Sequence, residues 1–501
     1  MDQFSQSRLV TREVDATPYA AALIEGHRDF GYSLETALAD VIDNSITAGA
    51  DTIKLIADTV TEYPSIALAD NGCGMSELQL IEAMRLGSKN PRDARTANDL
   101  GRFGLGLKSA SFSQCRRLTV ITRQNGYTSC ARWDLDRVSN QNNWNLELID
   151  NPESVTGCDL LLDCGTVVIW EKLDRLAGGY SDNQVKRAEH MNAELARAER
   201  HLRLVFHRFL DGKRPQLDLS LNGRRLKSID PMASTHPSCQ KDPEETLPIS
   251  QGDVRIRCYT LPHHKMVTRD EWDEIGGPEG HLKSQGLYVY RENRLIIAGG
   301  WLGLARQTEL TKLCRISIDI PNTMDAEWKI DVKKASAQLP PVVRERLKNV
   351  VERFVGTSKR TYRSRGQKLV DETRFPIWNR VKKDGQIIFR PNLDHPVFRA
   401  YASKLPDTLV EGFELCLRLV GSGLPIETLH AELVGNAESV TADSADEADL
   451  EQMVRAMADT LISNGVTLEL LADTMQSYPF LRENWVTASR ILKDYVEGLS
   501  E

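Results

Sequence analysis

The chain has 501 residues, of which 41% are hydrophobic and 27% charged, and its formal net charge is −8. This length exceeds what one core supports and predicts about three domains of roughly 150 residues each. No apolar run approaches the roughly 20 residues of a membrane span, and the first residues lack the apolar core of a signal peptide. The negative charge argues against a protein that coats nucleic acid. We therefore expect a cytoplasmic globular protein with no membrane partner.

The first functional candidate is a predicted helix in the stretch "ALADVIDNSITAGAD". On a helix Asp40, Asp43 and Asn44 share one face, and aliphatic residues form the opposite, apolar face. Ser33 has the character of an N-cap, and Gly49 stands where a glycine stops a helix. Whether this acid–amide cluster performs chemistry depends on the motifs that follow it.

A strand-like run, "SIALAD", ends in Asp70, with Gly72 and Gly74 in the turn after it. An aspartate at a strand end, beside glycines that let the backbone approach a flat ligand, suits a hydrogen bond to an amino group such as that of adenine. Asp-Asn-Gly is also a common turn sequence. The motif alone leaves both interpretations open.

A glycine-rich loop, "GRFGLGLK", occupies residues 101–108. Its three glycines allow consecutive backbone N–H groups to point at phosphate oxygens, and the helix predicted to follow offers its positive end. The loop is neither a dinucleotide fingerprint nor a Walker loop, because no strand leads into it and Leu107 separates Gly106 from Lys108. A glycine loop without a ligand is the alternative.

The fourth motif is Gly165-Thr166, which opens the strand-like run "TVVIW". In this order, the acid–amide helix, D-x-G-x-G, G-x-x-G-x-G-x-K and G-T resemble the ATP site of the GHKL superfamily (gyrase, heat-shock chaperones, histidine kinases and MutL). The resemblance implies an α+β fold: an α/β sandwich in which helices carry the nucleotide on one face of a mixed, largely antiparallel sheet.

The resemblance also implies roles for individual residues. Asn44 would bind the Mg²⁺ that bridges the phosphates, and Asp43 would orient Asn44 or a water. Asp70 would bind the adenine amino group, assisted by Thr166. Gly72, Gly74 and Met75 are expected to contact ATP near the adenine ring. The residues expected to form a lid over the phosphates are Gly101, Arg102, Phe103, Gly104, Leu105, Gly106, Leu107 and Lys108.

The position of the catalytic base departs from the pattern of the hydrolytic branch. That branch places a glutamate there to orient the attacking water, whereas this chain has Asp40, and Thr47 replaces the aspartate of the usual "D-A" ending. Aspartate reaches roughly 1–1.5 Å less far, and a misplacement of about 1 Å can cost on the order of 10²-fold in rate. We expect Asp40 to act as a base and hydrolysis to be slow.

The next segment extends the resemblance. "LSLNGRRLKSIDP", "GLYVYRENRLIIAGGWLGL" and "WKIDVKKASAQLPP" are similar to the transducer domain of the gyrase, MutL and MORC branch, in particular to bacterial MORC-like ATPases. That branch sends a transducer lysine to the γ-phosphate. Lys333 and Lys334 stand at the corresponding place, and we favour Lys333; an exposed basic turn is the alternative.

These patterns predict three domains. Residues 1–180 form the ATP-binding domain with an N-terminal arm, 181–356 an α/β transducer domain (ribosomal-protein-S5-like), and 357–501 a mainly helical region for partner or nucleic-acid contact. Long helices are expected over 183–209 and from about 341, and C-terminal helices near 396–404, 408–420, 425–434, 447–474 and 481–499.

Charge is distributed unevenly in the C-terminal third. Residues 344–368 contain nine Lys or Arg and two Glu, whereas 432–451 contain seven acids and no base. Two interpretations are open: residues 344–390 contact a nucleic-acid backbone such as DNA, or they form a solvated basic face that pairs with the acidic segment.

We therefore predict a Mg²⁺-dependent, slowly hydrolysing ATPase that works as an ATP-gated homodimerising switch. The N-terminal arm would cross between protomers, and the MORC-like resemblance implies partners in a phage-defence or DNA-linked system. The alternative is a chaperone-like or regulatory ATP-binding module with little hydrolysis that acts through protein–protein interaction. A sensor histidine kinase would need a dimerisation helix before the acid helix, and only about 30 residues precede it.

Overall fold

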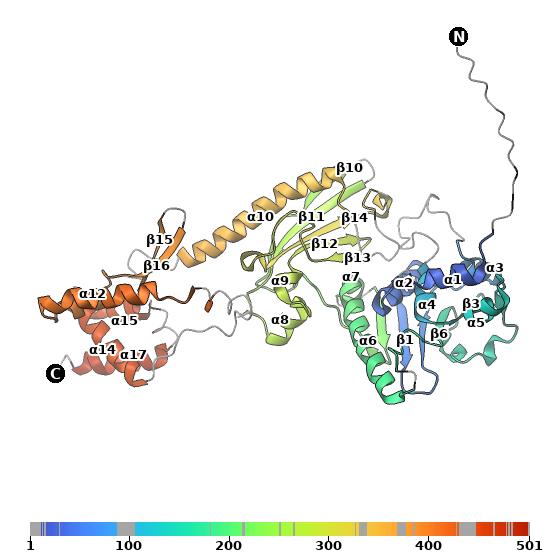
Figure 1. Ribbon diagram of the computed structural model, residues 1–501, viewed down its shortest axis with the longest axis horizontal. Helices are drawn as coiled ribbons and strands as arrows, with labels where there is room; N and C mark the ends of the chain where they lie inside the picture. Colours follow the sequence, from blue (N-terminus) through green and yellow to red (C-terminus); the bar gives the residue numbers. More distant parts are fainter. Residues whose placement is uncertain are drawn as a thin grey trace, which may run out of the picture. The chain divides into compact units, whose positions relative to one another are not determined.

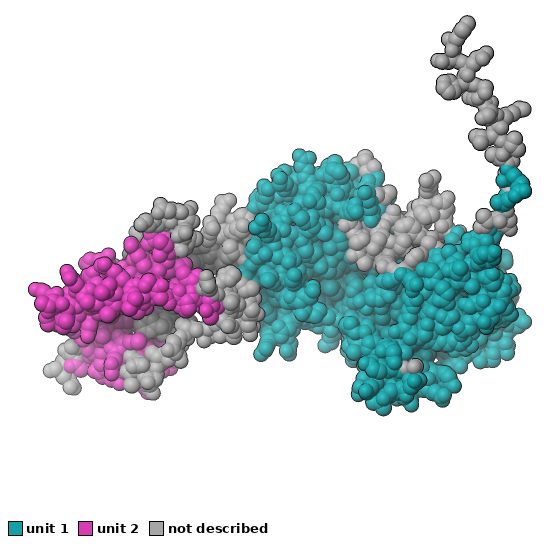
Figure 2. Space-filling model, in the orientation of Figure 1, with its two compact units in different colours: residues 1–358 teal, residues 359–501 magenta. Residues whose placement is uncertain are grey.

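The computed structural model contains two compact units, residues 1–358 and residues 359–501 (Figure 2). Among the described residues, no helix is long and apolar enough to cross a membrane. The structure describes residues 12, 14, 17–29, 31–87, 106–180, 182–212, 216–249, 252–263, 266–325, 327–329, 338–367, 377–383, 386–426, 428–429, 447–463, 466–476, 478, 481 and 484–498.

An eight-stranded sheet in the order β5-β4-β3-β6-β2-β1-β7-β8 forms the first layer of the first unit (Figure 1). Its neighbours pair antiparallel except β1 and β7, which are parallel. Because β7 and β8 come after residue 180, the sheet draws strands from both sides of the expected domain boundary, which stays a prediction. The strands are β1 (Thr52–Asp58), β2 (Ser65–Asp70), β3 (Arg117–Gln124), β4 (Tyr127–Asp134), β5 (Glu147–Leu148), β6 (Gly165–Glu171), β7 (Asp218–Leu221) and β8 (Arg224–Arg225).

Helices cover one face of this sheet. Alternate residues of a strand point to opposite faces, so Val120 and Trp170 enter the large core beneath the helices, whereas Ile121 and Ile169 enter a small core on the other face. The large core contains residues of α1 (Ala20–Arg28), α2 (Leu34–Thr47), α3 (Glu77–Met84), α4 (Gly106–Gln114), α5 (Leu135–Gln141), α6 (Gln184–Val205) and α7 (His207–Leu210). The turns η1 (Pro152–Ser154) and η2 (Cys158–Leu160) belong with the small core. The single helix expected over 183–209 is wrong in one respect, because the chain leaves helical geometry at Phe206, between α6 and α7.

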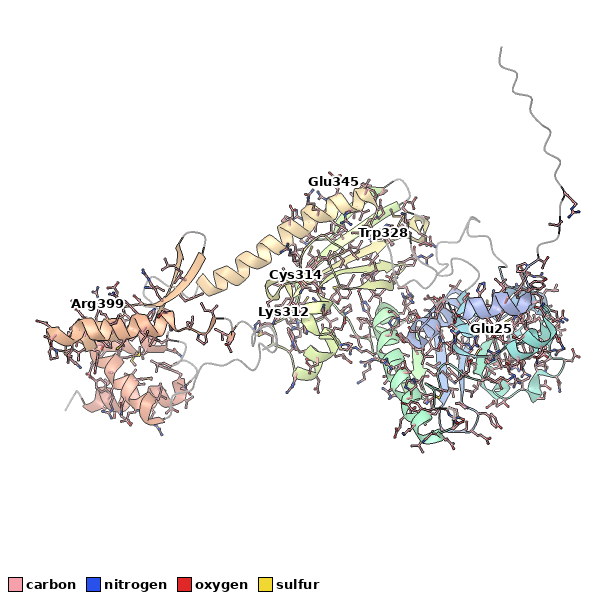
Figure 3. All side chains as sticks on the ribbon, viewed as in Figure 1. Glu25, Lys312, Cys314, Trp328, Glu345 and Arg399 are labelled. Carbon is pink, nitrogen blue, oxygen red and sulfur yellow. The ribbon has the colours of Figure 1, made fainter. Side chains whose placement is uncertain are left out.

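A second sheet of six strands follows in the same unit, in the order β10-β11-β14-β12-β13 with β9 paired to β11. The long helix α10 (Pro341–Gln367) lies along it (Figure 1), and Val343, Leu347 and Val350 pack into its core. Cys314 and Trp328, labelled in Figure 3, are buried in this core. The strands are β9 (Gln240–Lys241), β10 (Glu245–Ile249), β11 (Gly252–Thr260), β12 (Gly286–Arg291), β13 (Arg294–Ala298) and β14 (Cys314–Ile320), with α8 (Arg269–Gly276), α9 (Gly280–Ser284), η4 (Glu309–Thr311) and η5 (Asn322–Met324) between them.

The second unit is mainly helical. Its core is formed by α14 (Glu447–Ser463), α15 (Leu468–Gln476) and α17 (Trp485–Gly498), and α11 (Pro396–Ala402) packs against α14. Helix α12 (Asp407–Ser422) packs against a hairpin of β15 (Trp378–Lys383) and β16 (Gln386–Pro391). The single helix expected over 447–474 is wrong, since it is two helices; the sequence has Asn-Gly at 464–465, a common helix stop. The predicted fold class, a mixed sheet with helices and a helical C-terminal region, is confirmed.

Candidate functional site

Helix α2 carries the acid–amide cluster, and local sequence sets its ends. The backbone N–H of Ser33 donates to the hydroxyl of Thr36 at 3.1 Å, which confirms Ser33 as the N-cap, and Gly49 adopts φ 78° after the last turn. The acids are more buried than a simple amphipathic pattern predicts. Asp40 is 2% exposed and Asp43 0%, whereas Asn44 is exposed. Buried acids need partners.

The partner of Asp40 is Tyr32, which comes just before the N-cap. Its hydroxyl donates to Oδ2 of Asp40 at 2.8 Å, and both residues are buried. Helix α4 begins beside the same oxygen, because a Cβ added to Gly106 would lie 3.7 Å from it. The positive end of a helix favours a carboxylate. No sequence signal marked Tyr32, because it belongs to no motif.

Asp43 pairs with a residue 251 positions away in the sequence. Nε of Arg294, on β13, lies 3.3 Å from Oδ2 of Asp43, and the arginine side chain is only 4% exposed. The guanidinium also lies over the ring of Phe206, 5.4 Å from its centroid. Beside this pair, burial lowers the pKa of His201 to about 3, and the Arg294 charge acts in the same direction. The pair joins helix α2 to the second sheet.

Asp70 lies at the end of β2, 4% exposed, and three groups hold its carboxylate. The backbone N–H groups of Gly72 and Thr166 donate to Oδ1 at 2.9 and 3.2 Å, and the Ser45 hydroxyl donates to Oδ2 at 2.7 Å. Burial raises the pKa of Asp70, and these hydrogen bonds oppose the rise. A buried, fixed acceptor of this kind recognises a donor such as an amino group.

Strand pairing brings together the motifs that are expected to bind adenine. Thr166 pairs with Asp70 on one side and with Thr122 of β3 on the other. The Thr122 hydroxyl lies 3.2 Å from the Thr166 hydroxyl and accepts a hydrogen bond from the Met75 backbone at 2.9 Å. Gly74 is required here: its φ is +64°, and an added Cβ would meet a β3 carbonyl oxygen at 2.0 Å. Thr122 is a further residue that sequence reasoning missed.

The glycine loop is described only in part. Gly106 and Leu107 open α4, and Leu107 packs against the large core. Lys108 is buried, and its ammonium donates to the carbonyl of Ala83 at 2.8 Å, in the last turn of α3, where a cation is favoured. The other expected loop residues, Gly101, Arg102, Phe103, Gly104 and Leu105, lie outside the described residues, as do Lys333 and Lys334.

The residues present fit a magnesium–phosphate ligand. Mg²⁺ is bound in proteins by one or two oxygen ligands together with substrate phosphates and waters. Asn44 offers an exposed amide oxygen one helical turn beyond Asp40. The start of α4 beside Asp40 offers backbone N–H groups to an anion.

The part of the chain that contains most of this site is similar to known proteins. Residues 32–161 match the family described as "Histidine kinase-, DNA gyrase B-, and HSP90-like ATPase". The chain is 29% identical over 91 residues to ATPase morc-1 of Caenorhabditis elegans, covering 18% of this chain and 10% of that protein. It is 30% identical over 97 residues to ATPase MORC2B of Mus musculus, covering 19% and 9%.

A third relative is the chaperone protein HtpG of Vesicomyosocius okutanii subsp. Calyptogena okutanii (strain HA). It is 27% identical over 123 residues, which cover 22% of this chain and 19% of the chaperone. The chain thus spans a fifth or less of the length of these curated relatives. Residues 32–161 thus match a GHKL-type ATPase domain, and parts of the chain are similar to parts of two MORC ATPases and of the chaperone HtpG.

Proposed function

We propose that the chain binds Mg²⁺-ATP and hydrolyses it slowly. The observation that carries this proposal is the Asp70 carboxylate, buried at a strand end and held by Ser45, Gly72 and Thr166. A protein that only needed a turn here would gain nothing from burying a charge, because burial disfavours the ionised form. A site that recognises an amino group needs such an acceptor, and the similarity to ATPases supports adenine as that group.

The residues then take complementary roles in the reaction. Asp70 binds the adenine amino group, and the start of α4 faces the phosphates. Asn44 would hold Mg²⁺, which neutralises charge on the phosphate oxygens when bound. Asp40 accepts a proton from the attacking water, and Tyr32 fixes the orientation of that carboxylate. The shorter reach of aspartate keeps turnover below the median enzyme value of about 10 s⁻¹.

Titration calorimetry with a non-hydrolysable ATP analogue and Mg²⁺ tests binding. We expect Asn44→Ala to lose the magnesium-dependent part of the affinity. Asp40→Asn is expected to keep analogue affinity and lose phosphate release. If the unaltered chain shows no heat of binding, the proposal is wrong. If Asp40→Asn turns over ATP as the parent does, another group is the base.

The proposal includes an ATP-gated switch. Lys333 would contact the γ-phosphate from the segment that follows the second sheet, so bound ATP would favour one arrangement of the two sheets of the first unit. A ligand shifts such an equilibrium only through its differential affinity, and a lysine–phosphate pair supplies it. Small-angle scattering should show a dimer with the analogue and a monomer with ADP; equal mass in both states contradicts the switch.

The proposal includes DNA as a partner of residues 344–390. Residues 344–390 include the basic helix α10 and the β15–β16 hairpin, in which Ile388 and Phe389 are exposed. Fluorescence anisotropy with duplex DNA at two salt concentrations tests it, because phosphate contacts weaken steeply with salt. Absence of salt-dependent binding would leave a protein partner, including one from a phage-defence system. The HtpG similarity favours the chaperone-like alternative, which predicts analogue binding without measurable turnover.

A further inference from the structure

We infer that the β12–β13 hairpin positions helix α2, with Arg294 as the positioning residue for the acid–amide face that contains Asp40 and Asn44. This inference rests on the proposed function for its catalytic readout. It assigns a role to a residue that acts on the proposed base Asp40 only indirectly, through Asp43. The contact it uses is the Arg294–Asp43 ion pair.

Asp43 lies in α2 between the two side chains that are expected to act on ATP. It lies three residues after Asp40 and directly before Asn44, so any shift or rotation of α2 at Asp43 displaces both functional side chains. Asp43 is 0% exposed, and its carboxylate is held by Nε of Arg294 at 3.3 to 3.4 Å. As long as it stays buried, this carboxylate cannot leave its partner without a large loss of favourable interaction. The helix therefore follows the hairpin at this point.

A tight turn and a local hydrogen bond fix Arg294 within the β12–β13 hairpin. Its two-residue turn, Glu292-Asn293, has φ angles of 47° and 68°, the left-handed geometry that closes tight β-hairpins. Arg294 follows this turn directly, and its guanidinium also donates to the backbone carbonyl of Leu295 at 2.7 Å. Leu295 itself belongs to the large core under the helices. The guanidinium is thus fixed relative to the strand that carries it.

The other strand of the hairpin, β12, makes a second buried ion pair. Arg291, only 2% exposed, makes two hydrogen bonds to Asp325, at 2.6 and 2.9 Å. The neighbouring Glu292 carboxylate accepts from the backbone N–H of Asn322 at 3.2 Å. This segment immediately precedes, in the sequence, the stretch that contains Lys333. One hairpin therefore contacts α2 through Arg294 and the segment leading to the candidate phosphate lysine through Arg291.

Arg294→Gln tests the inference in the whole 501-residue chain, and Arg208→Gln is its matched control. Arg208 also joins a helix to the second sheet: it pairs with Asp319 of β14 and lies over the Tyr290 ring of β12, and neither contact involves α2. Arg294→Gln should lower kcat about tenfold or more, with KM within about threefold, since a misplacement of about 1 Å costs up to 10²-fold. Hydrogen exchange of the α2 amides should accelerate about tenfold. The control should change neither quantity, even if it unfolds at a similar temperature.

The double variant Asp43→Asn/Arg294→Gln covers the case in which Arg294→Gln fails to fold, because it leaves no unpaired buried charge. It should fold and still show the accelerated α2 exchange, which is its deciding readout because Asp43→Asn is itself expected to lower kcat. Arg291→Gln should lower kcat without altering α2 exchange. If Arg294→Gln matches Arg208→Gln in both kcat and α2 exchange, or if the double variant in its place matches it in α2 exchange, the inference is wrong. If the parent neither binds nor hydrolyses ATP, the proposed function fails instead, and α2 exchange alone still decides whether Arg294 positions the helix.

Discussion

Replacing Asp70 by asparagine separates folding from nucleotide recognition. Asparagine has nearly the same shape, and its Oδ1 can accept the same backbone hydrogen bonds, from Gly72 at 2.9 Å and from Thr166 at 3.2 Å. The Ser45 hydroxyl, 2.7 Å from the other oxygen, can turn to accept from the new amide. The three internal contacts therefore survive. The change toward the ligand is that an NH₂ donor replaces one carboxylate oxygen.

The sign of the stability effect follows from the pKa. Burial raises the pKa of Asp70, so its contribution to stability is full below the unfolded-state pKa and is lost as the pH rises through the folded-state pKa. At pH 7 the buried carboxylate is a net cost, and asparagine removes it. We expect the Asp70→Asn variant to have a free energy of unfolding at pH 7 equal to or above that of the parent.

The expected loss in ATP affinity is large by comparison. A hydrogen bond to a charged group contributes about 1.5–3 kcal/mol, which corresponds to a Kd about 10- to 150-fold higher. Calorimetry with the ATP analogue and denaturant unfolding measure the two effects. Asp58→Asn is the control. Asp58 is the last residue of β1, at the end away from Asp70, and its carboxylate accepts a hydrogen bond from the backbone N–H of Val60. Unchanged analogue affinity in Asp70→Asn would refute the assignment of this carboxylate.

Three further predictions concern the surroundings of the site. Tyr32→Phe removes the 2.8 Å hydrogen bond to the proposed base and should lower kcat about tenfold at unchanged analogue affinity; equal kcat would show that the hydroxyl does not orient the carboxylate. Gly74→Ala places a Cβ 2.0 Å from a carbonyl oxygen at φ +64° and should lower the free energy of unfolding by about 2–4 kcal/mol. Its control, Gly126→Ala, has φ +83° but open space around the Cβ, and should lower the free energy of unfolding by about 1 kcal/mol. Denaturant unfolding measures both. Because burial lowers the pKa of His201 from 6.5 to about 3, the unfolded chain binds that proton first, so stability should fall as the pH drops from 6.5, by about 1.4 kcal/mol per unit. His201→Gln should flatten that slope in denaturant titrations across this range.

Patterns within short segments predicted the local structure. The runs "SIALAD" and "TVVIW" became strands, because their β-branched and apolar residues suit a buried sheet. Ser33 caps α2 as its position indicated. The β15–β16 hairpin was not foreseen, since its basic residues give no clear alternation between apolar and polar positions. Helix periodicity likewise did not reveal the breaks after Val205 and Ser463.

Patterns within short segments could not predict contacts between residues that are distant in the sequence. Asp43 was expected to orient Asn44 or a water, and that role stays a prediction, but its ion pair with Arg294 depends on how the second sheet meets α2. Ser45 adjoins the helix motif, and its bond to Asp70 depends on the register between helix and strand. No spacing rule contains this information, because it arises only when separate elements pack.

The polar contact between α2 and the second sheet also bears on the switch. A buried ion pair is weak evidence for stability, because apolar residues of similar volume are often as stabilising. Arg294 and Asp43 therefore need another explanation than fold stability, and positional specificity is the best attested one. His201 supports this interpretation, since its Nε2 is buried with no hydrogen-bond partner among the described residues, a cost that an optimised permanent core would avoid. A contact made of charges fixes one relative position closely, and it can exchange its partners for water when the two sheets separate, which an apolar contact cannot do without loss.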